Sequence, residues 1–350
     1  RPDANIQIEH VALPAEPLSQ LRRRPFRFLW NNARATWQTL RQFRRDRPAA
    51  VIGLGSFASA PVILGARRLR IPIVLLEQNV IPGRVTRWIG RLAQTVCISF
   101  SETQPLLPSG CRAVVTGNPV RCSVRNAADR LKSVRPESGI TLMVLGGSQG
   151  AAALNAAVPK ALQAIRDQVP ELRVVHQAGA GQEESVQRAY GAMGIAAIVR
   201  PFFADLPDWM ARADLAVSRA GATTLAELAC LRVPAILVPY PYAADDHQLR
   251  NARFFELGGA AGLVCQSGND HWLGVLAESL ARLLTDPLQR HRMARAMARL
   301  AQPDAADRVA EQVARLIGHA PHADFPRVPH RLRAARPERA TAASLDRSAD

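Results

Sequence analysis

The 350-residue chain is poor in lysine, in paired cysteines and in long apolar runs. Only Lys132 and Lys160 are lysines among its 45 basic residues, so arginine supplies nearly all of the positive charge behind a formal net charge of +16. The five cysteines form no C-x-x-C pair, which argues for reduced thiols in a cytosol and against a disulfide framework or a zinc site. No run of about 18 apolar residues occurs, so the sequence predicts no membrane-spanning helix.

The arginines are concentrated in residues 21–47 and 327–339. The overall arginine content, with the many alanines, is partly a compositional habit of the source genome, so global charge is weak evidence for nucleic acid. A cluster on one element is a stronger indication of an anionic partner. Because the basic runs lack the base-stacking aromatics of nucleic-acid modules, no nucleic-acid partner is expected.

Short apolar runs alternate with amphipathic stretches along most of the chain. This alternation predicts an α/β fold with two Rossmann-like domains built on parallel sheets. A short strand is expected at 6–11. Further strands are predicted at 50–53, 71–77, 96–99, 113–116, 140–145, 174–177, 198–201, 215–218 and 233–238. Helices are predicted at 24–47, 60–69, 84–93, 151–169, 182–190, 206–212, 270–285, 287–300 and 304–317.

Composition shifts divide the chain. We expect a first domain over 1–121, a polar linker without periodicity over 122–138 and a second domain over 139–303. A C-terminal helix over 304–318 follows, and residues 319–350, rich in Arg, Pro and Ala, are expected to be a disordered basic tail.

The segment 213–251 is the most informative part of the chain. It is predicted as strand, glycine turn at Gly221, helix, strand, polar loop and helix. Thr223 and Thr224 are suited to cap the helix, and Glu227 lies one turn further in. Ligands bind at the carboxyl edge of open parallel sheets, and a helix N-terminus suits a phosphate. A carboxylate one turn in suits two sugar hydroxyls, so the segment predicts a nucleotide-sugar site; a capped helix with a surface glutamate is the alternative.

Three other polar clusters follow predicted strands. The glycine loop 146–151 contains Ser148, but it matches neither G-x-G-x-x-G nor a P-loop, and a plain tight turn remains open. Residues 77–79, Glu-Gln-Asn, end a strand of the first domain and are either site residues or an ordinary loop. The run 245–251 holds two aspartates and a histidine, whose spacing matches no standard metal-ligand set. Recognition of sugar hydroxyls suits this run better.

Residues 24–47 carry an apolar stripe at helical spacing that includes Phe26, Trp30 and Trp37, with arginines on the other side. This stripe either packs on the first domain or faces an anionic membrane surface. Trp88, with Arg87 beside it on a nearby helix, would extend a membrane patch.

Several strings in this order resemble one family, the MurG family of bacterial peptidoglycan N-acetylglucosaminyltransferases. The similarity spans about residues 1–318. The strings are Gly53–Pro61, IPIVLLEQNVIPG at 71–83, GNPVR at 117–121, LGGSQGA at 145–151, SRAGATTLAE at 218–227 and PYPYAADDHQLRNA at 239–252.

The resemblance implies a two-domain GT-B enzyme that binds UDP-N-acetylglucosamine (UDP-GlcNAc) in the second domain. It transfers GlcNAc, with inversion, to the 4-hydroxyl of N-acetylmuramic acid (MurNAc) in undecaprenyl-diphosphate-MurNAc-pentapeptide, converting lipid I to lipid II. Helix N-termini replace a metal, and no cofactor is expected. The enzyme would lie peripherally on the cytoplasmic face of the inner membrane, against its anionic surface, with other cell-wall synthesis proteins as partners.

The resemblance also assigns residue roles. Glu227 would hold the ribose hydroxyls, and Phe203 would lie beside the uracil. Ser148 and the turn at Ala222, Thr223 and Thr224 would contact the diphosphate. Gln248, with His247 and Asn251, would hold the GlcNAc hydroxyls. Asn79 and Arg121 would line the cleft from the first domain.

The chain departs from the family at its start. The family begins with strand–GGTGGH–helix, a loop whose histidine is proposed to act at the acceptor, and this sequence has no such motif. We therefore expect a first domain truncated at its N-terminus, lacking the first strand, helix and second strand. The general base is unassigned, with Glu77 and Asp246 as positional candidates. Alternative functions are another GT-B nucleotide-sugar enzyme, such as a glycolipid synthase or epimerase, or a non-catalytic UDP-sugar-binding protein at the membrane surface.

Overall fold

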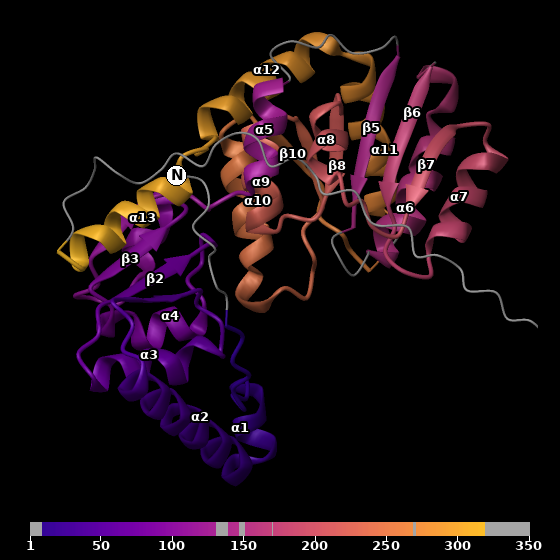
Figure 1. The fold of residues 1–350 in the computed structure, drawn as a ribbon. Coiled ribbons are helices and arrows are strands. Elements are labelled where there is room, and N and C mark those ends of the chain that lie inside the picture. The colour runs from indigo at the N-terminus through magenta and orange to yellow at the C-terminus, as the bar shows by residue number, and fades with distance from the viewer. Residues whose placement is uncertain (1–8, 131–138, 147–150, 170, 269–270, 319–350) are drawn as a thin grey trace, which may run out of the picture. The chain divides into compact units, whose positions relative to one another are not determined.

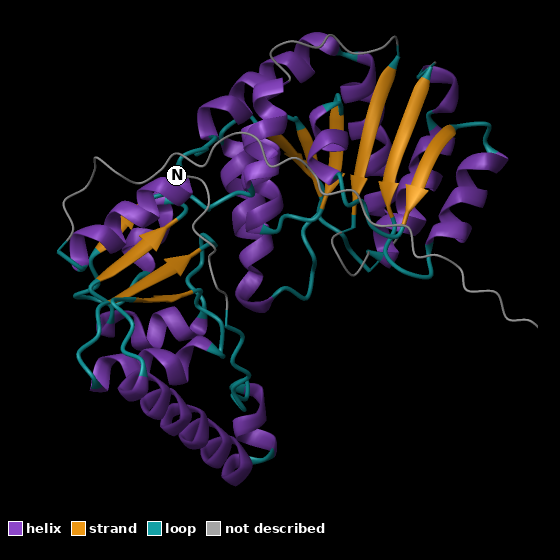
Figure 2. Ribbon diagram, viewed as in Figure 1, coloured by secondary structure: helices purple, strands orange, loops and turns teal. Residues whose placement is uncertain are grey.

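The computed structural model describes residues 9–130, 139–146, 151–169, 171–268 and 271–318 (Figure 1). Its strands form two parallel sheets with helices on their faces (Figure 2), so the predicted α/β class is confirmed. The strand expected at 6–11 lies mostly outside the described residues, and its described part, 9–11, forms no strand. The predicted tail, 319–350, also lies outside them.

The first sheet is parallel, in the order β1-β2-β3-β4. Its strands are β1 (Val51–Gly53), β2 (Ile73–Glu77), β3 (Thr95–Ile98) and β4 (Ala113–Val115). Every residue of β2 and β3 is buried, as expected of central parallel strands covered on both faces. Between the strands lie the helices α3 (Ser59–Arg68), α4 (Arg84–Ile89), η1 (Gly90–Leu92) and η2 (Ser101–Leu106).

Two helices precede this sheet, α1 (Ser19–Arg23) and α2 (Pro25–Arg45). Pro25 opens α2 at a position where its missing N–H costs nothing. The helix buries Ala35 and Thr39 as it packs on α3. A Cβ at Gly65 of α3 would lie 2.8 Å from the Thr39 Cγ2 atom, so glycine permits this close packing. The tryptophan-bearing side of α2 is therefore not its buried side.

The second sheet is parallel, in the order β10-β9-β8-β5-β6-β7. Its strands are β5 (Ile140–Leu145), β6 (Leu172–Gln177), β7 (Ala196–Arg200), β8 (Leu215–Ser218), β9 (Ala235–Leu237) and β10 (Ala261–Leu263), and β10 was not predicted. Its helices are α6 (Ala152–Ala164), η4 (Arg166–Gln168), α7 (Glu183–Ala192), α8 (Leu206–Ala211), α9 (Ala222–Leu231), η5 (Ala244–Asp246), α10 (His247–Leu257), α11 (His271–Thr285) and α12 (Pro287–Leu300).

Strand order reverses at β5, because the chain first adds β6 and β7 on one side and then β8 to β10 on the other. Such a switch point leaves a crevice outside the carboxyl ends of the two central strands. Alternate β5 side chains enter two separate cores, with Leu142 and Val144 in one and Met143 and Leu145 in the other. The rigid centre of this sheet thus fixes the loops that follow β5 and β8.

The prediction of an irregular linker over 122–138 is wrong for its first part. Residues 122–130 form helix α5 (Cys122–Arg130), which packs on α8 and α9 and buries Val124 and Ala127. Val124 and Ala127, one turn apart, pack this helix on the core. Two small apolar residues produce little hydrophobic periodicity, so the sequence did not indicate a helix here. Residues 131–138 lie outside the described part of the chain.

The last described helix, α13 (Ala305–Leu316), packs against the first sheet. Val309 shares a cluster with Val74 and Leu76 of β2 and Cys97 of β3. The chain therefore returns to its first half after completing the second.

Candidate active site

Helix α9 begins at the switch-point edge without a side-chain cap. Its N-cap residue is Gly221, with φ −69° and ψ 135°, and no side chain bonds to the first turn. The prediction that Thr223 and Thr224 cap this helix is therefore wrong, because both lie inside its first turn. Uncapped N–H groups at the start of α9 leave donors for an anion, and the helix dipole favours negative charge there.

Glu227 lies one turn inside α9 and is only 4% exposed. Its Oε1 atom accepts a hydrogen bond of 2.9 Å from the Nε atom of Arg121, which reaches it from the turn after β4. The arginine side chain is 49% exposed, so the pair has a buried anion and an open cation. A carboxylate held this way can accept hydrogen bonds from neighbouring hydroxyl groups.

Asn251 joins three segments and is fully buried. Its Nδ2 atom donates to Asn79 Oδ1 at 3.0 Å and to the Ala220 carbonyl at 3.3 Å, while its Oδ1 accepts the Val80 N–H at 3.0 Å. The prediction that Asn251 holds a sugar hydroxyl stays a prediction. The Asn251 amide ties the loop after β2 to the loop after β8, a positioning role, and Asn79 shares this link.

Glu77 closes β2 and shapes the loop that follows. It is 4% exposed; Oε1 accepts the Asn79 N–H at 3.2 Å and Oε2 accepts the Gly83 N–H at 2.8 Å. A carboxylate with both oxygens bonded to the backbone of its own loop is poorly suited to take a proton from a substrate. Of the two candidate bases, the structure thus gives Glu77 a structural function.

The remaining predicted sugar contacts, His247 and Gln248, lie in the first turn of α10, after the loop that follows β9. Gln248 Oε1 accepts the Tyr240 N–H at 2.9 Å, and His247 Nδ1 donates to the Ala244 carbonyl at 2.6 Å. Asp245 and Asp246 both have φ of 52°, in the left-handed region where aspartate is better tolerated than most residues. Asp246 is exposed and stays a candidate base.

The prediction that Phe203 lies beside the uracil stays a prediction. The Phe203 ring is 0% exposed and packs edge-on against Trp209, with 5.8 Å between centroids. Phe202, the preceding residue, follows the carboxyl end of β7 and is 59% exposed. A base can therefore stack on Phe202 and not on Phe203. Both phenylalanines lie beyond the end of β7 at Arg200, so which of them faces out depends on tertiary packing, which the sequence leaves open.

Arg219 is a residue that the sequence did not single out. Its Nη1 atom donates to the carbonyls of Val238 and Pro239 at 3.0 and 3.2 Å, and its Nη2 donates to Gln266 Oε1 at 2.9 Å. The guanidinium lies over the Tyr240 ring, 5.6 Å from its centroid. Burial lowers the pKa of Arg219. The residue fastens the loop after β8 to the loop after β9, so it orients both sides of the crevice.

A buried network underlies the other side of the switch point. His176 Nδ1 lies 2.9 Å from the Tyr190 hydroxyl and its Nε2 lies 3.0 Å from Asn155 Oδ1, while Asn155 Nδ2 donates to the Ala178 carbonyl at 2.8 Å. Burial lowers the pKa of His176 to about 4. The network fixes α6 against β6 at the start of α6. Ser148, in the glycine loop just before, lies outside the described residues.

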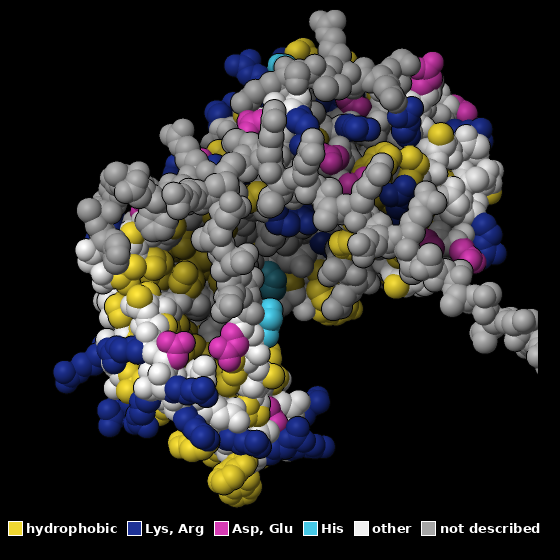
Figure 3. Space-filling view, in the orientation of Figure 1, with side chains coloured by type: hydrophobic (Ala, Val, Ile, Leu, Met, Phe, Trp, Pro, Cys, Tyr) yellow, Lys and Arg dark blue, Asp and Glu magenta, His cyan; other side chains and the backbone are white. Residues whose placement is uncertain are grey.

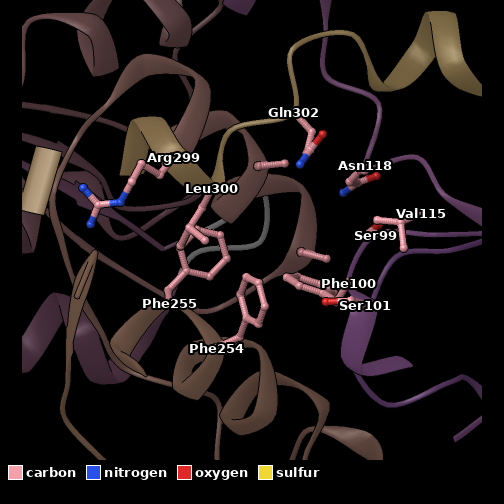
Figure 4. A pocket seen from close by; sticks show the side chains of 13 residues that line it. Ser99, Phe100, Ser101, Val115, Asn118, Phe254, Phe255, Arg299, Leu300 and Gln302 are labelled. Carbon is pink, nitrogen blue, oxygen red and sulfur yellow. The ribbon is translucent and has the colours of Figure 1, made fainter. Parts of the chain in front are cut away.

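Two cavities adjoin these loops. One, of about 320 Å³, is lined by residues near α1, by the loops after β1 and β2, and by Ala244, Asp245 and His247. The other, of about 120 Å³, lies where the chain passes between its two halves, with Asn118 and Gln302 side by side in its wall (Figure 4). Asn118 is 5% exposed, and both polar atoms of its amide lack a hydrogen-bond partner among the described residues.

The described residues include no clustered metal ligands, and two of the five cysteines are buried. Across the described residues, no group of three or more His, Cys, Asp or Glu side chains is arranged to hold a metal ion. Burial raises the pKa of Cys97 and of Cys230 to about 11, so neither forms a thiolate nucleophile near neutral pH.

The predicted membrane patch is exposed. Phe26, Trp30 and Trp37 are 88%, 72% and 57% exposed on α2, and Trp88 on α4 is 64% exposed. Figure 3 shows hydrophobic side chains beside Lys and Arg side chains in this region. The alternative, that the stripe packs on the first half of the chain, is therefore wrong. In the described part of the chain, no helix combines the length and apolarity needed to span a bilayer.

Comparison with known proteins gives the family. The model of the glycosyltransferase family 28 C-terminal domain matches residues 141–309, and that of the glycosyltransferase family 28 N-terminal domain matches residues 1–98. A protein of Rhodospirillum centenum is 41% identical over 281 residues, covering 79% of this chain and 74% of that protein. One from Hahella chejuensis is 42% identical, with coverage of 79% and 75%. Both are UDP-N-acetylglucosamine–N-acetylmuramyl-(pentapeptide) pyrophosphoryl-undecaprenol N-acetylglucosamine transferases.

The crystal structure of Acinetobacter baumannii MurG is also similar. It is 32% identical and superposes with a TM-score of 0.69 over 89% of this chain and 86% of that one. The chain belongs to the MurG family.

MurG-family membership confirms the GT-B architecture and the glycosyltransferase class predicted from sequence. A UDP-N-acetylglucosamine 2-epimerase of Neisseria meningitidis, solved with UDP-GlcNAc, is 13% identical with a TM-score of 0.60 over 81% of each chain, which shows a shared fold alone. The epimerase shares the fold of this chain, but its sequence identity of 13% is far below the 41% and 42% of the two transferases.

Proposed function

We propose that this chain transfers GlcNAc from UDP-GlcNAc to the 4-hydroxyl of MurNAc in undecaprenyl-diphosphate-MurNAc-pentapeptide, as its relatives' names describe. The observation that carries the proposal is the buried Glu227 carboxylate one turn inside the uncapped helix α9, at the switch-point edge of the second sheet. The Glu227 carboxylate can accept hydrogen bonds from hydroxyl groups, and the free backbone N–H groups at the start of α9 beside it can donate hydrogen bonds to a phosphate. We assign binding of the lipid-linked acceptor substrate to residues 1–121 and binding of UDP-GlcNAc to residues 139–303.

In the proposed donor complex Glu227 accepts hydrogen bonds from the ribose hydroxyls, and Arg121 neutralises the carboxylate or the neighbouring phosphate. Backbone N–H groups at Ala222, Thr223 and Thr224, with Ser148, bind the diphosphate. Phe202 stacks on the uracil. Gln248 and His247 contact the GlcNAc hydroxyls from the first turn of α10, where Gln248 also accepts the Tyr240 N–H from the loop that Arg219 fastens.

The proposed reaction is a single inverting displacement. The MurNAc 4-hydroxyl attacks C1 of GlcNAc, the C1–O bond to UDP breaks, and the hydroxyl proton passes to a general base. Preorganised backbone donors at the start of α9 stabilise the charge that develops on the leaving diphosphate. Asp246 is the proposed base, since Glu77 is committed to its loop. Such a base contributes roughly 10²–10⁴-fold to a rate.

The proposed location is the anionic inner leaflet of the plasma membrane. The exposed aromatic side chains of α2 and α4, with Arg27, Arg34 and Arg41 on α2, combine apolar insertion with electrostatic attraction. This surface would hold the enzyme where its lipid-linked acceptor lies.

The test is an assay with radiolabelled UDP-GlcNAc and purified lipid-linked acceptor in phosphatidylglycerol vesicles. We expect label in the lipid fraction and release of UDP. UDP-GlcNAc binding without transfer would favour a non-catalytic binding protein, and formation of UDP-N-acetylmannosamine would favour an epimerase. Either result would overturn the proposal.

A further inference from the structure

Two arginines on α4 converge on one carboxylate from the second half of the chain. Arg84 Nη2 lies 3.7 Å from Asp245 Oδ1, and Arg87 Nη2 contacts Asp245 Oδ2. The two guanidinium groups remain 58% and 41% exposed, and the carboxylate 33%. Two cations that share a single anion leave an excess of positive charge at an open position.

The aspartate in this cluster sits on a strained loop. Asp245 and the next residue, Asp246, are both left-handed, and two consecutive non-glycine residues in that region are strained and persist only where their surroundings hold them. The two arginines are the observed restraint on the Asp245 side chain. If another anion took the arginines, the loop would be free to relax.

The cluster of Arg84, Arg87 and Asp245 adjoins both the cavity of about 320 Å³ and the exposed Trp88 side chain. Arg84 and Asp245 line the cavity of about 320 Å³, together with Asn79 of the candidate site. Trp88, directly after Arg87 on α4, is 64% exposed and belongs to the proposed membrane patch. A molecule anchored in a bilayer at Trp88 would therefore pass the two arginines before it reached Asn79.

We propose that Arg84 and Arg87 bind the diphosphate of the lipid-linked acceptor, and that Asp245 occupies this anion site when no acceptor is bound. The inference rests on the proposed function. In such an acceptor the diphosphate connects the prenyl chain to the sugar, which matches the order of patch, arginines and cavity. A diphosphate diester carries about two negative charges and several acceptor oxygens, so it satisfies two guanidinium groups better than one carboxylate does.

If Arg84 and Arg87 form an anion site, two variants should behave differently than they would if the arginines only form a structural ion pair with Asp245. With a water-soluble acceptor that has a short prenyl chain, Arg84→Gln plus Arg87→Gln should raise the acceptor KM at least 10-fold, with the UDP-GlcNAc KM within twofold of wild type. Asp245→Asn should lower the acceptor KM about two- to fivefold, because the competing carboxylate is gone. If the pair only holds the structure together, both variants will raise the acceptor KM, and that result would overturn the inference.

The control is Arg67→Ala plus Arg68→Ala, which removes the same charge from exposed positions at the end of α3 and should leave both KM values unchanged. An effect of the Arg84 and Arg87 changes seen only with anionic vesicles, and absent with the soluble acceptor, would indicate lipid headgroups and would also overturn the inference. Thermal unfolding of each variant checks folding. A wild-type chain without transfer would instead refute the proposed function, so the two failures are distinguishable.

Discussion

The Nε atom of Arg121 lies 2.9 Å from Oε1 of Glu227, although 106 positions separate them in the chain. The pair joins the turn after β4 to the first turns of α9, so the candidate site contains a residue from each half of the chain.

Replacement of Glu227 by alanine should weaken UDP-GlcNAc binding at least 30-fold, because hydrogen bonds to a charged group contribute about 1.5–3 kcal/mol each. The fold should survive, since the freed Arg121 side chain is half exposed. Titration calorimetry measures the affinity, and Glu256→Ala, an exposed glutamate on α10, is the control. Unchanged affinity in Glu227→Ala would refute the ribose assignment.

The two adjacent phenylalanines should give different phenotypes. Phe202→Ala should raise the KM for UDP-GlcNAc about 5- to 20-fold with little change in stability, because its exposed ring is lost as a stacking surface. Phe203→Ala should instead lower the free energy of unfolding by about 3–5 kcal/mol, as expected for a buried ring. Steady-state kinetics and urea unfolding of both variants make the comparison. The reverse pattern would restore Phe203 as the uracil contact.

Replacement of both Trp30 and Trp37 by serine should reduce binding to phosphatidylglycerol vesicles at least 10-fold. Both side chains are more than half exposed, so melting temperature should change little. Leu257→Ser plus Leu288→Ser removes exposed apolar side chains elsewhere and is the matched control for a vesicle sedimentation assay. Equal losses in the two double variants would show that α2 has no special role at the membrane.

Acid should destabilise the protein partly through His176. Burial holds its pKa at about 4 in the folded chain against about 6.5 when unfolded, so the unfolded state binds the proton first as pH falls. This contribution is complete above pH 6.5 and is lost towards pH 4. At pH 4.5 the loss is about 2–3 kcal/mol. His176→Gln should remove that part of the pH dependence in urea unfolding at pH 7 and 4.5. Parallel pH profiles for the variant and wild type would contradict the assignment.

Gly117 should be intolerant of a side chain. Its φ is +83°, and a Cβ there would lie 2.5 Å from the Gln302 Cβ atom where the chain crosses between its halves. Gly117→Ala should lower the free energy of unfolding by about 2–4 kcal/mol through backbone strain and overpacking. Gly110→Ala is the matched control, because its φ is +86° and a Cβ at this position would have no neighbouring atom within 4 Å. It should cost only about 1–2 kcal/mol. Equal losses would mean that Gln302 yields to the new methyl group.

The sequence predicted most strands and helices because buried parallel strands and amphipathic helices leave strong apolar patterns. It missed β10, whose three residues Ala261–Leu263 are too few to show a period, and α5, whose buried face consists of Val124 and Ala127. Whether such short or weakly patterned segments form a strand or a helix depends on their tertiary contacts.

The positions of the candidate site residues were easier to predict from sequence than their contacts. Glu227 was located correctly at a sheet edge, because glycine turn, helix start and carboxylate lie within one local segment. The roles of Asn251 and Glu77 depend on partners in other segments or on backbone N–H groups, which residue type does not encode. The convergence of Arg84 and Arg87 on Asp245 likewise requires two distant segments to meet.

The packing of α13 on the first sheet has a consequence during synthesis. Val309 covers Val74 and Cys97, but it leaves the ribosome about 200 residues after Cys97, roughly 10–40 s later at ordinary elongation rates. During that interval the face of β2 and β3 that carries Val74 and Cys97 lacks its native cover. The first sheet can therefore complete this part of its core only after α13 has left the ribosome.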